Sequence, residues 1–364
     1  MNLARIALNS YVFKKEPVSL IHFVTNKCNA RCKHCFIDFD HPDVFKGELT
    51  LEEIDKLTKS FGRSMLNVNL TGGEPFLRKD FFEIVKMYFE NAGIRSVYIT
   101  TNGMFTQLTK NFLDRFIEFG INGNVILSFS VDNFEEGHDE NRRVKGLYQN
   151  TLKTYNLVKN YHLPNIMANI SITVTDHNYD QVIDLYHYLK DVKKVDAFTA
   201  IAMREEGVIK KIDPDIKQNI WRAYVNLTKL IKEDMLRDEI KGYKKEGLQG
   251  TLLNSKNMIM YKNIADSYLK PQYISHCPAG ALFGVIWANG MVYPCEILNK
   301  PLGNLRDYNM NFMELWKNEK TKEVKKFIKD TDCNCTFECA WAINIISNKR
   351  YIPTLIKNSI KQKI

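Results

Sequence analysis

The chain has 364 residues, of which 45% are hydrophobic and 26% charged, and its net charge is +9. This length exceeds one small domain and suits a large α/β domain with an appendage. The 51 basic residues are interspersed with 42 acidic ones, and no platform of basic and aromatic side chains is visible, so no nucleic-acid partner is expected. The first residues lack the features of a signal peptide, which predicts a cytoplasmic protein whose eight cysteines are metal ligands rather than disulfides.

Strand-like and helix-like segments alternate from Val18 to about Met203. The β-rich runs are 18–26, 66–72, 96–102, 124–132, 168–175 and 196–203. Helical patterns lie between them, near 50–62, 79–92, 106–119, 148–161 and 178–192. This alternation predicts an α/β fold, a partial (β/α)6 TIM-like barrel whose chemistry sits at the C-terminal ends of the parallel strands.

The rest of the chain predicts a smaller C-terminal domain joined through helices. Residues 213–240 have apolar side chains at helical spacing, and the pattern weakens around 242–270, where we place the boundary. The expected segments are an N-terminal extension at 1–17, the barrel core at 18–210, a helical connector at 211–270, a small domain at 271–345 and a basic amphipathic tail at 346–364.

Three cysteines follow the first predicted strand, in the run Cys28-Asn-Ala-Arg-Cys32-Lys-His-Cys35. Thiolates at this spacing can hold three corners of a cubane iron–sulfur cluster and leave the fourth iron free for another ligand. Structural zinc is the alternative, but it needs a fourth ligand, and His34 between two cysteines is poorly placed to provide one. The triplet therefore favours a 4Fe–4S cluster.

Polar motifs stand at the ends of the next two strands. The second strand ends in Thr71-Gly72-Gly73-Glu74, where two glycines permit close approach of a ligand and a carboxylate can accept hydrogen bonds from an ammonium group. A simple turn is the alternative for this motif. The third strand ends in Thr100-Thr101-Asn102-Gly103.

The fourth strand and the loop after it add hydroxyl, carboxylate and guanidinium groups. Strand alternation places Ser128, Ser130 and Asp132 on one face, which suits a ribose, although a polar strand end is the alternative. Arg142, in the following stretch from His138, can pair with a carboxylate above the barrel mouth, or be an ordinary solvated charge.

Taken together, these motifs resemble those of radical S-adenosylmethionine (radical SAM) enzymes over about residues 18–205. The resemblance implies a 4Fe–4S cluster on Cys28, Cys32 and Cys35, whose open iron is chelated by SAM. It further implies that an electron from a donor such as flavodoxin or ferredoxin cleaves SAM to a 5′-deoxyadenosyl radical, which abstracts hydrogen from a substrate.

The same resemblance assigns the SAM contacts. Gly72, Gly73 and Glu74 would hold the methionine amino end, with Ser130 and Asp132 at the ribose, Arg142 at the carboxylate and Asn102 as a further contact. One departure is His34, because the residue before the third cysteine is usually a carbocyclic aromatic in the family. An imidazole can still stack near adenine.

The other five cysteines lie near the C-terminus, at Cys277, Cys295, Cys333, Cys335 and Cys339. Asn289-Gly290 between two β-rich runs predicts a two-residue hairpin that returns Cys295 toward Cys277. This part resembles the SPASM and twitch auxiliary-cluster domains of radical SAM enzymes, which implies one auxiliary 4Fe–4S cluster on four of these cysteines, with one to spare among Cys333, Cys335 and Cys339. Zinc is the alternative.

These features predict an enzyme that oxidises or epimerises a small molecule. A ribosomally made peptide (a RiPP maturase activity) is the alternative substrate, and the roughly 17 residues before the first strand are too few for a leader-binding module. An alternative of another class is a non-catalytic iron–sulfur or zinc-binding module. Glu205 and Glu206, after the sixth strand, are candidate catalytic acids or bases, and Tyr293 and Glu296 beside Cys295 are further candidates; a solvated or packing role is the alternative for each.

The last sixteen residues carry five basic and no acidic side chains. Ile352, Ile356, Ile360 and Ile364 recur every fourth residue after Pro353, which predicts an amphipathic helix. We expect this stripe to pack on the protein itself, with peripheral contact to an anionic membrane as the alternative.

Overall fold

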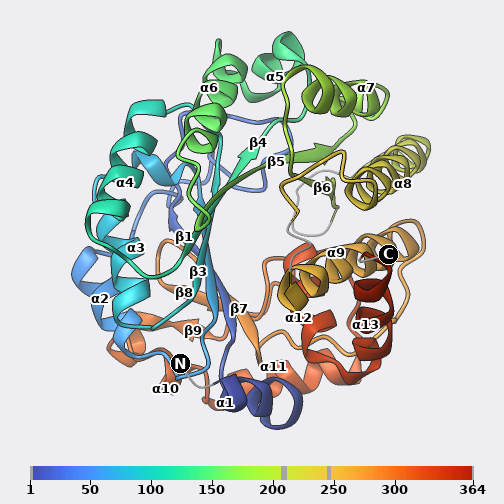
Figure 1. The fold of residues 1–364 in the computed structure, drawn as a ribbon. Helices are drawn as coiled ribbons and strands as arrows, with labels where there is room; N and C mark the ends of the chain where they lie inside the picture. Colours follow the sequence, from blue (N-terminus) through green and yellow to red (C-terminus); the bar gives the residue numbers. More distant parts are fainter. Residues whose placement is uncertain (1–2, 206–210, 244–246, 363–364) are drawn as a thin grey trace.

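The computed structural model describes residues 3–205, 211–243 and 247–362, and it is built around one nine-stranded sheet (Figure 1). The strand order is β6-β5-β4-β3-β2-β1-β7-β8-β9. Neighbouring strands from β6 to β1, and β1 with β7, are parallel, whereas β8 and β9 are antiparallel additions. The strands are β1 Ser19–Thr25, β2 Asn67–Gly72, β3 Ser96–Thr101, β4 Asn124–Ser130, β5 Ile166–Val174, β6 Phe198–Ala202, β7 Phe283–Ile286, β8 Met291–Tyr293 and β9 Gly303–Asn304. The predicted α/β fold with six successive parallel strands is therefore confirmed.

Helices cover the outer face of this sheet. Those of the first half are α2 Leu51–Lys59, α3 Phe81–Glu90, α4 Thr106–Glu118, α5 Glu135–Arg142, α6 Leu147–Lys159 and α7 Val182–His187, with short turns at Pro75–Leu77 and Tyr188–Val192. Local sequence explains the helix starts: at α2, Thr50 and Glu53 form a reciprocal capping box. The short helix α5 was not predicted, because its sequence is polar throughout.

The two faces of the sheet differ in burial, which orients the site. In β4, Val125, Leu127 and Phe129 are fully buried against the helices, whereas Ser128 and Ser130 on the other face are only partly buried. In β2, Asn69 lies on the corresponding partly buried face, between buried Val68 and Leu70. Alternation along each strand thus gives an apolar outer face and a more polar inner face.

The C-terminal half continues the same sheet instead of standing apart from it. Strand β7 pairs with β1, and the predicted hairpin follows: the Trp287 N–H donates to the Met291 carbonyl at 2.8 Å. Three residues, Ala288 to Gly290, separate this pair, so the loop is one residue longer than the predicted two-residue turn. Gly290 lies at a φ of +83°, which explains the glycine.

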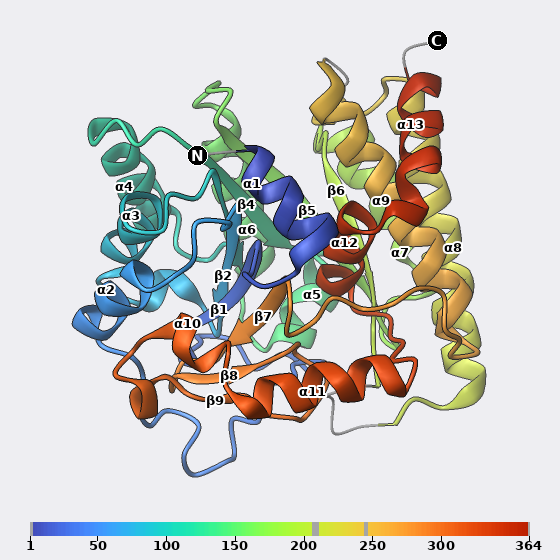
Figure 2. The same ribbon diagram turned by 90° about the horizontal axis from the view of Figure 1, so that it is seen from below.

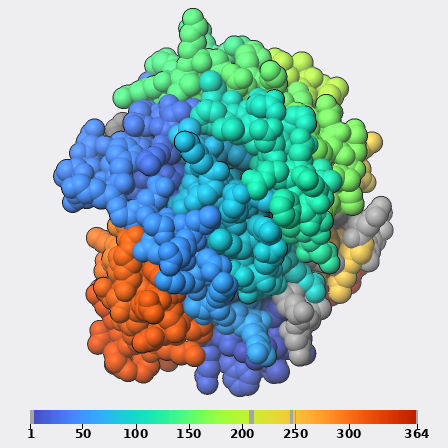
Figure 3. All heavy atoms as spheres, turned by 90° about the vertical axis from the view of Figure 1, so that its left-hand side faces the viewer, coloured from blue at the N-terminus to red at the C-terminus, as the bar shows by residue number. Residues whose placement is uncertain are grey.

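The C-terminal region also packs against the first helices of the barrel. It contains Leu305–Tyr308, α10 Phe312–Leu315 and α11 Glu319–Asp330. Arg306 donates to both carboxylate oxygens of Glu53 in α2, at 2.6 and 2.9 Å, and Phe312 stacks edge-on against Phe61 at 4.9 Å. In Figure 3 these orange residues lie directly against the blue ones of the N-terminal third.

The remaining helices form a separate layer beside β6 (Figure 2). They are α8 Pro214–Leu236, α9 Gly247–Tyr268, α12 Glu338–Ser347 and α13 Ile352–Lys361, preceded by a turn at Lys349–Tyr351. At the other end of the chain, α1 Leu3–Leu8 and the turn Asn9–Phe13 reach this layer, since the Tyr11 hydroxyl donates to the Ile346 carbonyl at 2.7 Å. None of the helices in the described ranges combines the length and the apolar character needed to cross a membrane.

The C-terminal tail is a helix, as predicted, but the expectation that its isoleucine stripe packs on the protein is wrong. Ile352, Ile356 and Ile360 are 37%, 50% and 55% exposed, and Ile364 lies outside the described residues. The buried face of α13 instead carries Leu355, which joins the hydrophobic core, and Ser359, which lies 3.1 Å from Ser255 of α9; after the helix, Gln362 accepts from Asn254 at 3.0 Å. Leu355 and these hydrogen bonds to α9 therefore set the rotation of this helix.

Gly72 and Gly73 bring the end of β2 against the chain that follows β1. Gly72 has a φ of +142°, and a Cβ atom there would lie 2.0 Å from the Thr25 carbonyl oxygen; at Gly73 it would lie 2.1 Å from that of Lys27. The Gly73 and Glu74 amides donate to these two carbonyls, each at 2.8 Å. The close approach that the glycines permit is thus to the protein's own backbone.

Gly73→Ala is expected to lower the free energy of unfolding by more than about 3 kcal/mol, because backbone atoms cannot yield to the added methyl group. Gly120→Ala is the matched control: it has a φ of +60° but no atom within 4 Å of the added Cβ, so it should cost about 1–2 kcal/mol. Chemical denaturation of both variants measures the difference. Equal losses would contradict the close backbone approach.

Candidate functional site

The first three cysteines lie in the loop after β1. Cys32 and Cys35 are joined by a turn in which the Cys35 amide donates to the Cys32 carbonyl at 3.1 Å. The thiols are close enough for Cys32 and Cys35 to raise the pKa of Cys28, although burial contributes more, and that pKa reaches about 11. All three thiol pKa values are raised, so a cluster would displace protons as it binds.

Glu74 and Asn102 link the ends of β2 and β3 to this loop. Glu74 is fully buried and accepts from the Asn102 amide at 2.8 Å, the Thr101 hydroxyl at 2.8 Å and the Phe76 amide at 3.1 Å. Burial raises its pKa to about 7. The Asn102 side chain donates to Asn29 at 2.8 Å and lies 4.0 Å from the Cys28 sulfur. Both residues therefore position the cysteine loop.

Asp132 and Arg142 form a buried ion pair, with Arg142 Nη2 donating to Asp132 Oδ2 at 2.5 Å. Burial by itself would raise the pKa of the Asp132 carboxyl. The positive charge of Arg142 outweighs burial, and the pKa of Asp132 falls to about 2. Helix α5, which carries Arg142, also meets the cysteine loop directly: the Arg31 and Lys33 amides donate to the Arg142 and Asn141 carbonyls at 3.1 and 3.0 Å.

His34 belongs to the same group. Its Nδ1 lies 3.1 Å from the Asn141 side-chain nitrogen, and its Nε2 lies 3.7 Å from Asp132 Oδ2. Burial lowers the pKa of this imidazole, so it is neutral at physiological pH. The family's usual aromatic is thus replaced by a ring that hydrogen-bonds to α5.

Four of the five C-terminal thiols form a second group. Cys277, Cys333 and Cys335 line one small pocket beside Trp341. The pKa of Cys277 is raised to about 12, mainly by burial and further by the nearby thiols of Cys333 and Cys295. Four soft sulfur ligands suit an iron–sulfur cluster.

Cys339 lies elsewhere. It is the second residue of α12, and the Asn69 side chain of β2 donates to its sulfur at 3.6 Å. After burial, the charges that act most on its pKa are those of Glu296, Glu338, Arg204 and Lys256, rather than other thiols. Within the described ranges, no three His, Cys, Asp or Glu side chains converge closely enough to bind a single metal ion as they stand.

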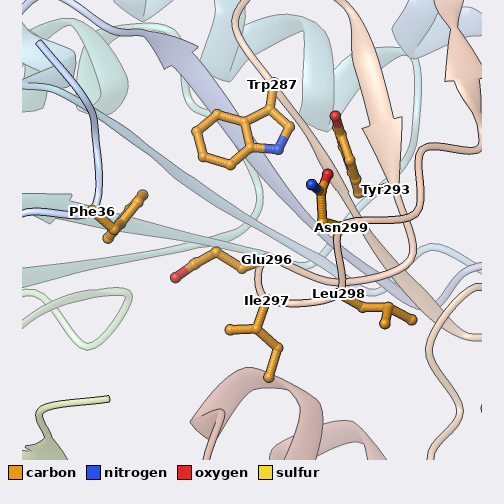
Figure 4. Close-up of a pocket in the computed structure, with 7 residues that line it drawn as sticks. All are labelled: Phe36, Trp287, Tyr293, Glu296, Ile297, Leu298 and Asn299. Atoms are coloured by element: carbon orange, nitrogen blue, oxygen red, sulfur yellow. The ribbon is translucent and has the colours of Figure 1, made fainter. Parts of the chain in front are cut away.

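A pocket of about 280 Å³ is lined by residues that directly follow a cysteine in each group, Phe36 after Cys35 and Glu296 after Cys295 (Figure 4). Phe36 and Trp287 of the hairpin line it together and pack edge-to-face, with ring centroids 6.2 Å apart. The remaining lining residues are Tyr293, Ile297, Leu298 and Asn299. Aromatic and aliphatic side chains thus line the cavity together with polar ones, including one carboxylate, a combination typical of a substrate site.

Two segments of the chain match known families. Residues 23–189 match the Radical SAM superfamily, and residues 277–340 match SPASM, an iron–sulfur cluster-binding domain. This chain is a radical SAM protein with a SPASM domain.

Similar proteins have different activities. The radical SAM protein is 27% identical over 324 residues to the AdoMet-dependent heme synthase of Methanosarcina barkeri (strain Fusaro / DSM 804), covering 85% of this chain and 84% of the relative. It is 25% identical over 310 residues to the sporulation killing factor maturation protein SkfB of Bacillus subtilis (strain 168), covering 84% of this chain but only 65% of SkfB. The structure of anSMEcpe with bound AdoMet has a TM-score of 0.63 at 20% identity, covering 96% of both chains, which shows the fold.

The structure brings most of the predicted SAM contacts of this radical SAM protein to one end of the sheet, but with different partners. Glu74 is engaged by backbone amides, and Asp132 and Arg142 pair with each other. Ser130 ends β4 on the inner face.

The four candidate catalytic residues differ in their relation to the pocket. Glu205 pairs with Lys217 of α8 and accepts from the Ile212 amide, so its carboxylate is used in holding α8. Glu206 lies outside the described residues. Tyr293 and Glu296 do line the pocket.

Sequence reasoning missed Arg204, Glu338 and Trp287. Arg204 follows the sixth strand just as Glu205 does, and it forms an ion pair with Glu296 at 2.5 Å. Its position at a strand end was the available signal. Nothing local marks Glu338, whose surroundings come from β6 and the loop after β8.

Glu74→Gln is expected to lower the free energy of unfolding by about 1–3 kcal/mol, because both carboxylate oxygens accept hydrogen bonds and the amide nitrogen would face a donor. Urea denaturation measures the loss. Glu52→Gln is the control: that side chain is 78% exposed and forms an ion pair with Lys56, so the change should be below about 0.5 kcal/mol. A Glu74 variant as stable as the native protein would refute the structural role.

Proposed function

We propose that this protein is an enzyme that reductively cleaves SAM and abstracts hydrogen from a substrate held in the pocket that Phe36 and Glu296 line. The observation that carries the proposal is the loop of Cys28, Cys32 and Cys35. Three thiols from one loop suit a cluster with one iron left for SAM, and the Gly72–Glu74, Asn102 and Asp132–Arg142 groups all adjoin that loop. When bound, the cluster and SAM would supply one-electron reduction and hydrogen abstraction.

The surrounding side chains would bind SAM by exchanging partners. Arg142 would turn part of its guanidinium from Asp132 to the SAM carboxylate, which frees a carboxylate oxygen of Asp132 for the ribose beside Ser130. Gly72, Gly73 and Glu74 would offer backbone groups to the amino end, because the Glu74 side chain is engaged, and Asn102 would keep its place beside Cys28. An electron donor such as flavodoxin or ferredoxin would complete the system.

We assign the auxiliary 4Fe–4S cluster to Cys277, Cys295, Cys333 and Cys335, and leave Cys339 without iron. The first four thiols are close enough together to shift pKa values within the group, whereas Cys339 lies next to Asn69 and charged side chains.

Replacing Cys335 by Ser is therefore expected to remove about four irons per chain, whereas Cys339→Ser should keep the native iron and sulfide content. Colorimetric iron and sulfide determination after anaerobic reconstitution measures both. Loss of the auxiliary cluster in the Cys339 variant would overturn the ligand assignment.

The substrate is either a small molecule or a peptide. The heme synthase favours the former. SkfB, a killing-factor maturation protein, and the structure of anSMEcpe with AdoMet and the Kp18Cys peptide favour the latter. Oxidation and epimerisation both begin with hydrogen abstraction and remain the two proposed outcomes.

The experiment that tests the catalytic proposal is anaerobic. Reconstituted protein with SAM and a strong reductant is expected to form 5′-deoxyadenosine, and the variant with Cys28, Cys32 and Cys35 all changed to Ala should form none. Iron and sulfide analysis of both proteins is the control for loading. A fully loaded native protein that neither cleaves nor binds SAM would favour a non-catalytic iron–sulfur or zinc module.

A further inference from the structure

A cluster of charged side chains joins the pocket to the interior of the barrel. It consists of Arg204 after β6, Glu296 after β8, and Glu338 at the start of α12, and we call it the Arg204 cluster. Arg204 Nη2 donates to Glu296 Oε1 at 2.5 Å, and the guanidinium lies over the Phe337 ring at 4.7 Å. Glu296 also lines the pocket of Figure 4, so this carboxylate connects the pocket to Arg204.

Two buried atoms of the cluster have no hydrogen-bond partner among the described residues. They are Arg204 Nη1, a donor, and Glu338 Oε1, an acceptor. Arg204 and Glu338 are close enough for their charges to shift each other's pKa, yet no ion pair joins them. Leaving such groups unpaired is costly, and a bound water or a polar group of a ligand would relieve that cost.

The chemistry of such a ligand follows from the two atoms. An N–H donor next to a carboxylate acceptor complements a group that offers an acceptor and a donor side by side. A peptide amide does this with its C=O and N–H, and it carries no charge that would have to be desolvated in this buried place. A carboxylate or phosphate ligand would satisfy Arg204 but face Glu338 and Glu296.

We propose that Arg204 and Glu338 clamp an amide group of the substrate, Arg204 donating to its carbonyl and Glu338 accepting from its N–H. This rests on the proposed function and deepens it, because it selects a peptide or another amide-containing substrate over one without an amide. The clamp would hold that substrate beyond Glu296, where the ends of β6 and α12 meet, next to the Cys339 thiol.

The clamp can be tested without substrate, by measuring the stability of a variant. Glu338→Gln should leave the free energy of unfolding unchanged or slightly raised, because the carboxylate oxygen that it replaces has no hydrogen-bond partner. The remaining side-chain oxygen can still accept the hydrogen bond that the Ala202 N–H donates to Glu338. Glu74→Gln, the same change at a buried glutamate whose oxygens are all engaged, should destabilise. Equal destabilisation by the two substitutions would overturn the clamp.

Binding provides the second measurement. The probes are N-acetylalanine N-methylamide and its all-ester counterpart, O-acetyl-lactic acid methyl ester, titrated by saturation-transfer NMR into anaerobic, cluster-loaded protein with SAM. The native protein should bind the amide about tenfold more tightly than the ester. Glu338→Gln, which puts a donor where the acceptor was, should abolish this preference, and so should Arg204→Lys, whose ammonium can pair with Glu296 but lacks the second planar nitrogen.

Iron content and SAM cleavage are measured on the same samples. Iron content and SAM cleavage of the native protein test the radical SAM assignment, whereas the preference for the amide tests the clamp, so the two failures are distinguishable. A native protein with no preference for the amide, or variants that retain the preference, would overturn the proposal.

Discussion

The parallel pairing of β1 with β7 is the constraint on which the rest of this structure depends. Strand β1 is buried along its whole length and ends at the first cysteine loop, and β7 begins the hairpin that leads to Cys295. Backbone hydrogen bonds between these two strands therefore fix both cysteine groups to one sheet. The pocket lies beside this junction and is lined by Phe36 and Trp287, whose rings pack edge-to-face. Phe23 of β1 stacks on Trp287 at 4.2 Å and strengthens the junction.

The motif residues near the first cysteine loop are held by other parts of the same chain. Gly72 and Gly73 admit the backbone of Thr25 and Lys27, and Glu74 satisfies amides at two strand ends. Asp132 and Arg142 neutralise each other in a buried place where either charge alone would be costly. Residues that a ligand would use are thus held in position by partners inside the chain, which is how a site becomes preorganised.

The sequence predicted what depends on local pattern, and missed what depends on distant neighbours. The six parallel strands and most of their helices follow from the alternation of strand and helix patterns, and the hairpin follows from Asn289-Gly290. The pairing of β7 with β1 has no local signal, because the partners are more than 250 residues apart. The exposed isoleucine stripe of α13 has the same cause: the hydrogen-bonding face that α9 presents is invisible in the tail's own sequence. At the site, spacing identified the cysteines and the loop motifs, but only the fold separates Cys339 from the other four and sets Arg204 beside Glu296.

The loop from Glu296 to Asn299 has a consequence for how such a protein can diversify. Ile297, Leu298 and Asn299 line the pocket in succession, yet none of them lies in the sheet or is a proposed iron ligand. The Leu298 amide donates to the Cys295 sulfur at 3.3 Å, but this contact is made by the backbone, so changes of side chain at these three positions can reshape the cavity while leaving it and the β1–β7 junction in place. Selection for a new substrate can therefore act on this short stretch separately from selection for the radical chemistry, so that one scaffold gives rise to enzymes of different specificity.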